Sequence, residues 1–121
     1  MIIMTLRFTV PPERIADVIA IISSIKEPIC IEPGCSHFSL YNDINNIDND
    51  NALMLVGEWE SQDALEEVIR MEDFSKIFVA IELARRAPEI SFNTVSDRVG
   101  FELIEKLRGA KNEGNDDRSE G

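Results

Sequence analysis

The chain has 121 residues, a length typical of one domain, and a formal net charge of −11 from 23 acidic and 12 basic residues. This balance argues against nucleic-acid binding, which needs a basic surface, and against an anionic membrane surface. Residues 2–10 alternate between apolar and mixed faces, which predicts a first strand that Pro11 and Pro12 end.

The next segment predicts a helix followed by a second strand. Apolar residues recur at helical spacing from Ile15 to Ile25, and Pro28 is expected to end the helix. Pro33-Gly34 is a turn signal, after which Cys35 to Asn42 alternates as a strand. The Asn/Asp-rich residues 43–51 lack the ligand spacing of a calcium loop and are interpreted as a solvated hairpin turn.

The second half of the domain predicts a strand, two helices and a last strand. The third strand covers Ala52 to Glu60, and Ser61 is a plausible N-cap for the helix that follows. A break near residues 72–73 separates that helix from a second one at Phe74 to Arg86, which carries Ile77 and Phe78 on its apolar face and ends before Pro88. Residues 89–96 alternate as the last strand.

This order of elements is that of an α+β, ferredoxin-like split βαβ domain, with a four-stranded antiparallel sheet and helices on one face. The other face keeps apolar residues, so we expect two copies to cover each other as a dimeric α+β barrel. The predicted organisation is a domain at 1–97, a C-terminal helix at 98–108 that Gly109 ends, and a disordered acidic tail at 109–121. The helix could cap the pocket or the partner subunit.

Cysteine content and hydropathy suggest a cytoplasmic protein. No apolar run approaches the ~20 residues that span a bilayer, and the first residues lack the pattern of a signal peptide. Cys30 and Cys35 are the only cysteines, and we expect both thiols to be reduced. No metal site is expected, because His37 has too few ligands around it.

Three short motifs carry a resemblance to a known family. Glu32-Pro33-Gly34-Cys35 precedes the second strand, Glu58-Trp59-x-Ser61-x-x-Ala64-Leu65 joins the third strand to its helix, and Phe74 follows a short break. With these motifs, residues 1–97 resemble the antibiotic biosynthesis monooxygenase superfamily of dimeric α+β barrels, and in particular its small quinol monooxygenase-like proteins. The resemblance implies a homodimer that oxygenates a small aromatic or quinol ligand without a cofactor.

The chain departs from the family at the positions that usually carry activity. Val68 and Asp73 stand where quinol-oxidising relatives usually have histidines. Leu6 and Phe78 stand where haem-degrading relatives have an asparagine and a haem-ligating histidine, so haem cleavage is poorly supported.

The remaining polar and aromatic residues supply the candidate site. His37 is the only histidine, the residue type best suited to act as a base near neutral pH, and it could serve as one, with Tyr41 on the same strand face orienting the substrate, if that face turns toward the helices. The alternative places His37 at the dimer face or the surface. Trp59 either lines the pocket between sheet and helices, as its family role implies, or fills the core.

Three further residues are candidate ligand contacts. Arg7 could hold an anionic substrate, or pair with Glu58 across the sheet. Glu58 could equally be a structural partner at the dimer interface, and Asn93 is a further polar residue available to the site.

Three functions therefore stay open. The first is a cofactor-independent monooxygenase. The second is a non-catalytic ligand-binding or regulatory dimer of the same fold. The third is an association module whose pocket is filled by Trp59, Phe74 and Phe78.

Overall fold

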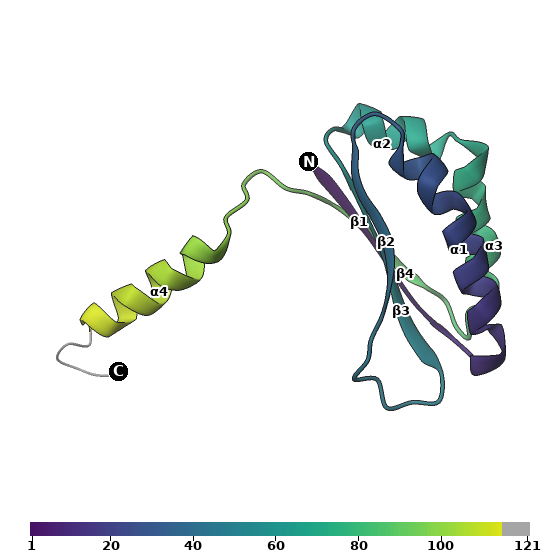
Figure 1. Cartoon of the computed structure of the whole chain (residues 1–121), viewed down its shortest axis with the longest axis horizontal. Helices are drawn as coiled ribbons and strands as arrows, with labels where there is room; N and C mark the ends of the chain where they lie inside the picture. The colour runs from purple at the N-terminus through teal and green to yellow at the C-terminus, as the bar shows by residue number, and fades with distance from the viewer. Residues whose placement is uncertain (115–121) are drawn as a thin grey trace.

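In residues 1–114, which this computed structural model describes, four antiparallel strands form one sheet in the order β2-β3-β1-β4. Helices α1, α2 and α3 cover one face of the sheet, and α4 stands apart from it (Figure 1). Side chains are described as far as residue 109. The elements are β1 (Ile2–Val10), η1 (Pro12–Arg14), α1 (Ile15–Cys30), β2 (Cys35–Asn42), β3 (Asn51–Trp59), α2 (Gln62–Ile69), η2 (Glu72–Ser75), α3 (Lys76–Ile81), β4 (Glu89–Thr94) and α4 (Phe101–Gly114). The α+β, split βαβ order predicted from the sequence is confirmed.

The core lies between the sheet and the three helices. Alternation along β1 and β3 points Met4, Leu6 and Trp59 to this side, where they are fully or almost fully buried. The helices contribute Ile22, Ile25 and other apolar residues of the stripe predicted for α1. Such burial is the main stabilising term of the fold, at about 25 cal/mol per Å² of apolar surface.

Pro28 does not end α1, contrary to the sequence prediction. The helix continues to Cys30 with Pro28 inside it. Pro28 has no backbone N–H, so the last turn of α1 lacks one hydrogen bond. The residue after it, Ile29, is fully buried in the core. Tertiary packing therefore outweighs the local preference of proline.

The helix predicted from Phe74 to Arg86 is also shorter and divided. Phe74 lies in the 3-10 turn η2, and α3 ends at Ile81. The chain leaves the helix because the Arg85 N–H donates to the Thr9 carbonyl of β1 at 2.8 Å. Phe78 was expected on the inward face, but it is 58% exposed.

A β-bulge interrupts the alternation predicted for Cys35 to Asn42. Cys35 pairs with Trp59, whereas His37 pairs with Glu58, and the register shifts between Cys35 and His37. Cys35 therefore shares the helix side with Trp59. His37 and Tyr41 lie on the opposite side, which we call the open face because no helix covers it (Figure 1).

The C-terminal helix begins and ends later than the sequence indicates. It starts at Phe101, and Gly109 lies inside it instead of ending it. The predicted disordered tail is thus helical as far as Gly114, and its residues 115–121 lie outside the described residues. None of the described helices is long and apolar enough to cross a membrane.

Candidate functional site on the open face of the sheet

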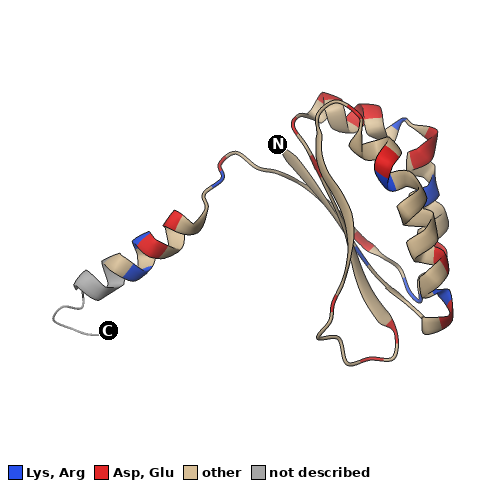
Figure 2. Ribbon diagram, viewed as in Figure 1, with Lys and Arg blue, Asp and Glu red and all other residues tan. Residues whose placement is uncertain are grey.

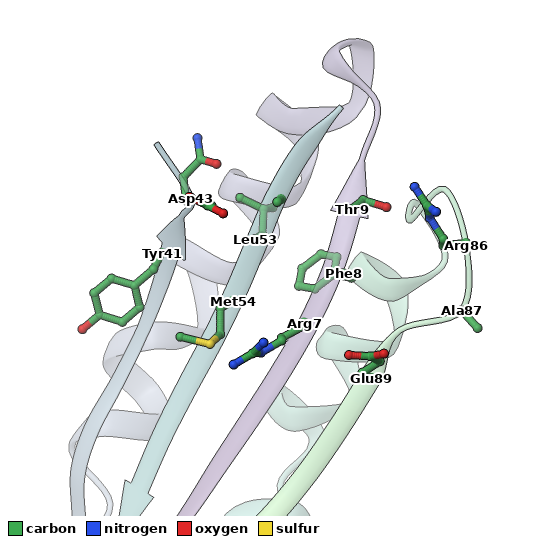
Figure 3. Close-up of a pocket in the computed structure, with 12 residues that line it drawn as sticks. Arg7, Phe8, Thr9, Tyr41, Asp43, Leu53, Met54, Arg86, Ala87 and Glu89 are labelled. Carbon is green, nitrogen blue, oxygen red and sulfur yellow. The ribbon is translucent and has the colours of Figure 1, made fainter. Parts of the chain in front are cut away.

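A pocket of about 660 Å³ lies on the open face, at the end of the sheet where β1 finishes. Arg7 and Met54 lie at its centre, with Tyr41 on one side and Glu89 on the other (Figure 3). The pocket reaches the loops as well as the strands. Its lining is Arg7, Phe8, Thr9, Tyr41, Asn42, Asp43, Ala52, Leu53, Met54, Arg86, Ala87 and Glu89.

Tyr41 lines this pocket and forms a hydrogen bond with His37. Its hydroxyl lies 2.7 Å from His37 Nε2, and the two rings stack at 16° with centroids 6.0 Å apart. Two residues on one face of a strand, four apart in sequence, reach each other because their side chains are long. His37 itself does not line the pocket, so Tyr41 is the member of the pair that a ligand would meet.

The face bearing this pair is the one that points away from the helices. Phe38 and Leu40 turn toward the core, and His37 and Tyr41 therefore turn toward the open face. The sequence analysis made His37 a base only if its strand face turned toward the helices. The structure turns that face away from them. Any site that uses this pair lies on the outside of the sheet.

Arg7 does not pair with Glu58, which corrects one alternative drawn from the sequence. In the strand ladders Arg7 lies opposite Met54 and Glu89. Glu58 lies opposite Ile3, roughly 13 Å further along β1. Among the described residues Arg7 forms no ion pair, and its guanidinium is exposed at the pocket.

Glu58 and Asn93 belong to the other end of the open face. Both lie opposite Ile3, one on each side of β1. The Glu58 carboxylate lies 3.6 Å from the Arg98 guanidinium, in the segment that leads to α4. The structure therefore separates these two candidates from the pocket at which Arg7 and Tyr41 meet.

Trp59 occupies the core and lines neither this pocket nor the smaller hollow between α1 and β2. Its ring makes an edge contact with Phe38, with centroids 6.5 Å apart. Its indole N–H has no hydrogen-bond partner among the described residues. The geometry agrees with the core-filler alternative, since the ring is completely buried.

The sequence analysis missed a salt bridge near the pocket, between Asp50 and Arg85. Asp50, in the β2–β3 loop, accepts two hydrogen bonds from the Arg85 guanidinium, at 2.9 and 3.1 Å. This contact holds the pKa of the Asp50 carboxyl below its usual value, chiefly through the hydrogen bonds from Arg85. Because 35 residues separate the pair, no local pattern could have revealed it.

Of the twelve residues that line the pocket, the sequence analysis named only Arg7 and Tyr41 as site residues; the residues it missed include Thr9, Met54, Arg86 and Glu89. Met54 and Glu89 could have been found from the register, because both pair with Arg7. Thr9 is unusual in that its buried hydroxyl has no hydrogen-bond partner among the described residues.

Both cysteines are free and partly buried. Burial raises the pKa of the Cys35 thiol, and the neighbouring Cys30 adds to the effect. A raised thiol pKa lowers the thiolate fraction near neutral pH, so Cys35 is a poor nucleophile.

Comparison with known proteins identifies the family. Residues 1–79 match the antibiotic biosynthesis monooxygenase family, to which the chain therefore belongs. No curated protein sequence matches the chain significantly.

Solved structures share the fold at low sequence identity. A conserved protein from Methanosarcina mazei is 25% identical, with a TM-score of 0.68 over 76% of this chain and 89% of that chain. A protein from Mycobacterium tuberculosis is 20% identical, with a TM-score of 0.70 over 82% and 98%. SnoaB from Streptomyces nogalater, described as a cofactor-independent oxygenase, is 15% identical, with a TM-score of 0.66 over 81% and 95%.

Proposed function

We propose that this protein is a homodimeric, cofactor-independent monooxygenase of a small hydroxylated aromatic or quinol, and that its substrate binds in the open-face pocket. Family membership supports the reaction class. The observation that carries the proposal is the 2.7 Å contact between Tyr41 and His37 at the edge of that pocket. The cytoplasm is the proposed setting, as expected from the sequence.

The pair supplies a route for a proton. With Nε2 unprotonated, His37 accepts a hydrogen bond from the Tyr41 hydroxyl, whose oxygen can in turn accept one from a substrate hydroxyl. Proton transfer from substrate through Tyr41 to His37 would leave an electron-rich substrate anion. Arg7, exposed at the pocket centre, is positioned to stabilise that anion.

The reaction needs no external reductant. The substrate anion gives its electrons to dioxygen, and a ring carbon forms a new C–O bond while the O–O bond and the C–H bond of that carbon break. One oxygen atom stays on the ring as a carbonyl, and the other leaves as water with the C–H proton and the proton held by His37. The protein holds the anion against an apolar wall that includes Met54 and Ala52, both on the open face of β3. A water-poor wall strengthens the electrostatic contacts in the pocket.

A second copy would supply the missing cover. The four strands carry only three charged residues, Arg7, Glu58 and Glu89, whereas the helices are rich in charge (Figure 2). A sheet face with few charges and with Ile3, Met54 and Val56 partly exposed is typical of a surface that another subunit covers. Packing two such faces together would enclose the pocket.

A non-catalytic ligand-binding dimer is the second candidate. It is favoured by Val68 and Trp59, both fully buried, which fill the space between sheet and helices where the resemblance implies the family pocket. Such a protein would bind an aromatic ligand without consuming oxygen.

An oxygen electrode separates the two functions. Purified protein is mixed with hydroquinone or dihydroxynaphthalene, against a protein-free control for spontaneous oxidation. We expect catalysed oxygen uptake, which falls roughly 10²-fold or more in Tyr41→Phe and in His37→Ala. Ser36→Ala, an exposed residue of the same strand, should leave the rate unchanged.

Two results would decide against catalysis at this pocket. Equal rates in wild type and Tyr41→Phe would remove the proposed proton route. Ligand-dependent thermal stabilisation without oxygen uptake would establish the binding function instead.

A further inference from the structure

Helix α4 has an apolar side with nothing packed on it. Phe101, Leu103, Ile104 and Leu107, which we call the α4 stripe, are between 43% and 68% exposed. At 100° per residue they share one side of the helix, together with the charged Arg108, while Glu102, Glu105 and Lys106 occupy the other. An amphipathic helix of this kind needs a partner surface to be stable.

The edge strand β4 has a complementary exposed patch. Ile90 and Phe92, the β4 patch, lie opposite Leu6 and Met4 and so face the helix side of the sheet. Leu6 and Met4 are buried, but Ile90 and Phe92 are 51% and 45% exposed. Edge strands with bare apolar residues are usually covered, because they otherwise promote aggregation.

The chain cannot easily lay its own α4 on its own β4 patch. The Val95 N–H donates to the Met1 carbonyl at 2.8 Å, and the Arg98 guanidinium reaches Glu58 at 3.6 Å. Glu58 lies on the open face, so Arg98 holds the linker on that side, whereas the β4 patch lies on the opposite side. Figure 1 shows α4 projecting into the space in front of the open face.

We propose that α4 is an arm that packs the α4 stripe on the β4 patch of a second copy of this chain. The inference rests on the homodimer proposed above, in which the second copy covers the open face. The arm projects on the same side of the sheet as this second copy would lie (Figure 1).

Symmetry supports the same occupant. In a dimer whose two-fold axis ran parallel to the strands, the partner's β4 would lie over this chain's β2, at the opposite edge of the sheet. Arg98 reaches from the β4 side past Met1 to β3, which is the direction of that edge. Each copy then gives one arm and receives one, and both apolar surfaces are buried twice per dimer.

Sedimentation equilibrium on the full chain tests the arm. We expect Leu107→Asp to raise the dimer dissociation constant roughly 10-fold or more, because it places a charge in the buried stripe. Lys106→Asp, on the polar side of the same helix, is the matched control and should leave the constant within about two-fold.

The outcomes separate the arm from the dimer. Equal dissociation constants in the two variants would overturn the arm and leave the dimer standing. A wild-type monomer would overturn both, while the oxygen-uptake assay still judges the reaction independently.

Crosslinking distinguishes an arm between subunits from one within a chain. Ile104→Cys and Phe92→Cys are combined with Cys30→Ser and Cys35→Ser, and a short bis-maleimide is added to a mixture of ¹⁴N- and ¹⁵N-labelled protein. We expect linked peptides of mixed isotope. Links of uniform isotope only, in a sample shown to exchange subunits, or no link between the two sites in an intact dimer, would overturn the proposal.

Discussion

The indole ring of Trp59 lies against the Cα of Gly57, two residues earlier on the same strand face. A Cβ atom at Gly57 would come within 2.7 Å of Trp59 Cζ3, closer than real contacts allow. Because Trp59 is fully buried, it has little room to move. Glycine at this position therefore makes space for the ring at the centre of the core.

Gly57→Ala should destabilise the fold by about 1–3 kcal/mol, since the added methyl overpacks the core. Urea denaturation followed by Trp59 fluorescence measures the change. Gly109→Ala is the control and should not lower the midpoint, because nothing lies within 4 Å of that position and alanine favours a helix more than glycine does. An unchanged midpoint in Gly57→Ala would mean that the ring does not occupy this place.

Thr9→Val should be neutral or stabilise the protein by up to about 1 kcal/mol. The buried Thr9 hydroxyl has no partner among the described residues, so replacing it with a methyl of similar shape removes a desolvation cost. Thr5→Val is the matched comparison, since the Thr5 hydroxyl bonds Ser91 at 2.9 Å. Thr5→Val should lower the denaturation midpoint. A larger fall of the midpoint in Thr9→Val than in Thr5→Val would contradict the view that the Thr9 hydroxyl has no partner.

Strand and helix periodicity predicted most of the fold. The alternation of β1 and the Ser61 cap were both readable, and Ser61 Oγ indeed accepts from the Ala64 N–H at 3.2 Å. The errors lie where distant contacts override local preference. Pro28 stays helical because Ile29 is held in the core, and α3 stops early because Arg85 bonds β1.

The candidate site was predictable only in part. The sequence placed His37 and Tyr41 on one strand face and left open which side of the sheet that face takes. The register assigns the core side to Phe38 and Leu40, and so the open face to His37 and Tyr41. Arg7 was singled out as a lone cation on a strand. Its neighbours could not be named without the register of the strands. That register places Glu58 opposite Ile3, at the start of β1 and far from Arg7.

Asp50→Asn should remove a pH-dependent contribution to stability. Arg85 lowers the folded-state pKa of Asp50 below its unfolded value of about 3.9, so the ion pair stabilises the fold above that pH. The contribution is lost as the pH falls through the folded-state pKa. The urea midpoint of the wild type should exceed that of Asp50→Asn at pH 6, and the two should converge as the pH falls below the folded-state pKa of Asp50.

A constant difference between the two midpoints from pH 6 down through the titration of the Asp50 carboxyl would contradict this account. It would assign the effect of the substitution to the shape of the β2–β3 loop instead of the Asp50 charge. Asp48→Asn, in the same loop and without an ion pair among the described residues, is the control.

Met54 and Met4 report on the two sides of the sheet and test the central claim, that the ligand binds on the open face. Met54 lines the open-face pocket, whereas Met4 is buried on the helix side and pairs with Gly57 beneath Trp59. With the methionine methyls labelled with ¹³C, the four methionines are followed by NMR while dihydroxynaphthalene is added without oxygen. The account predicts that the Met54 methyl resonance shifts in a saturable way while Met4 stays fixed. A saturable shift of Met4 with Met54 unmoved would place the ligand between sheet and helices and contradict the proposed site.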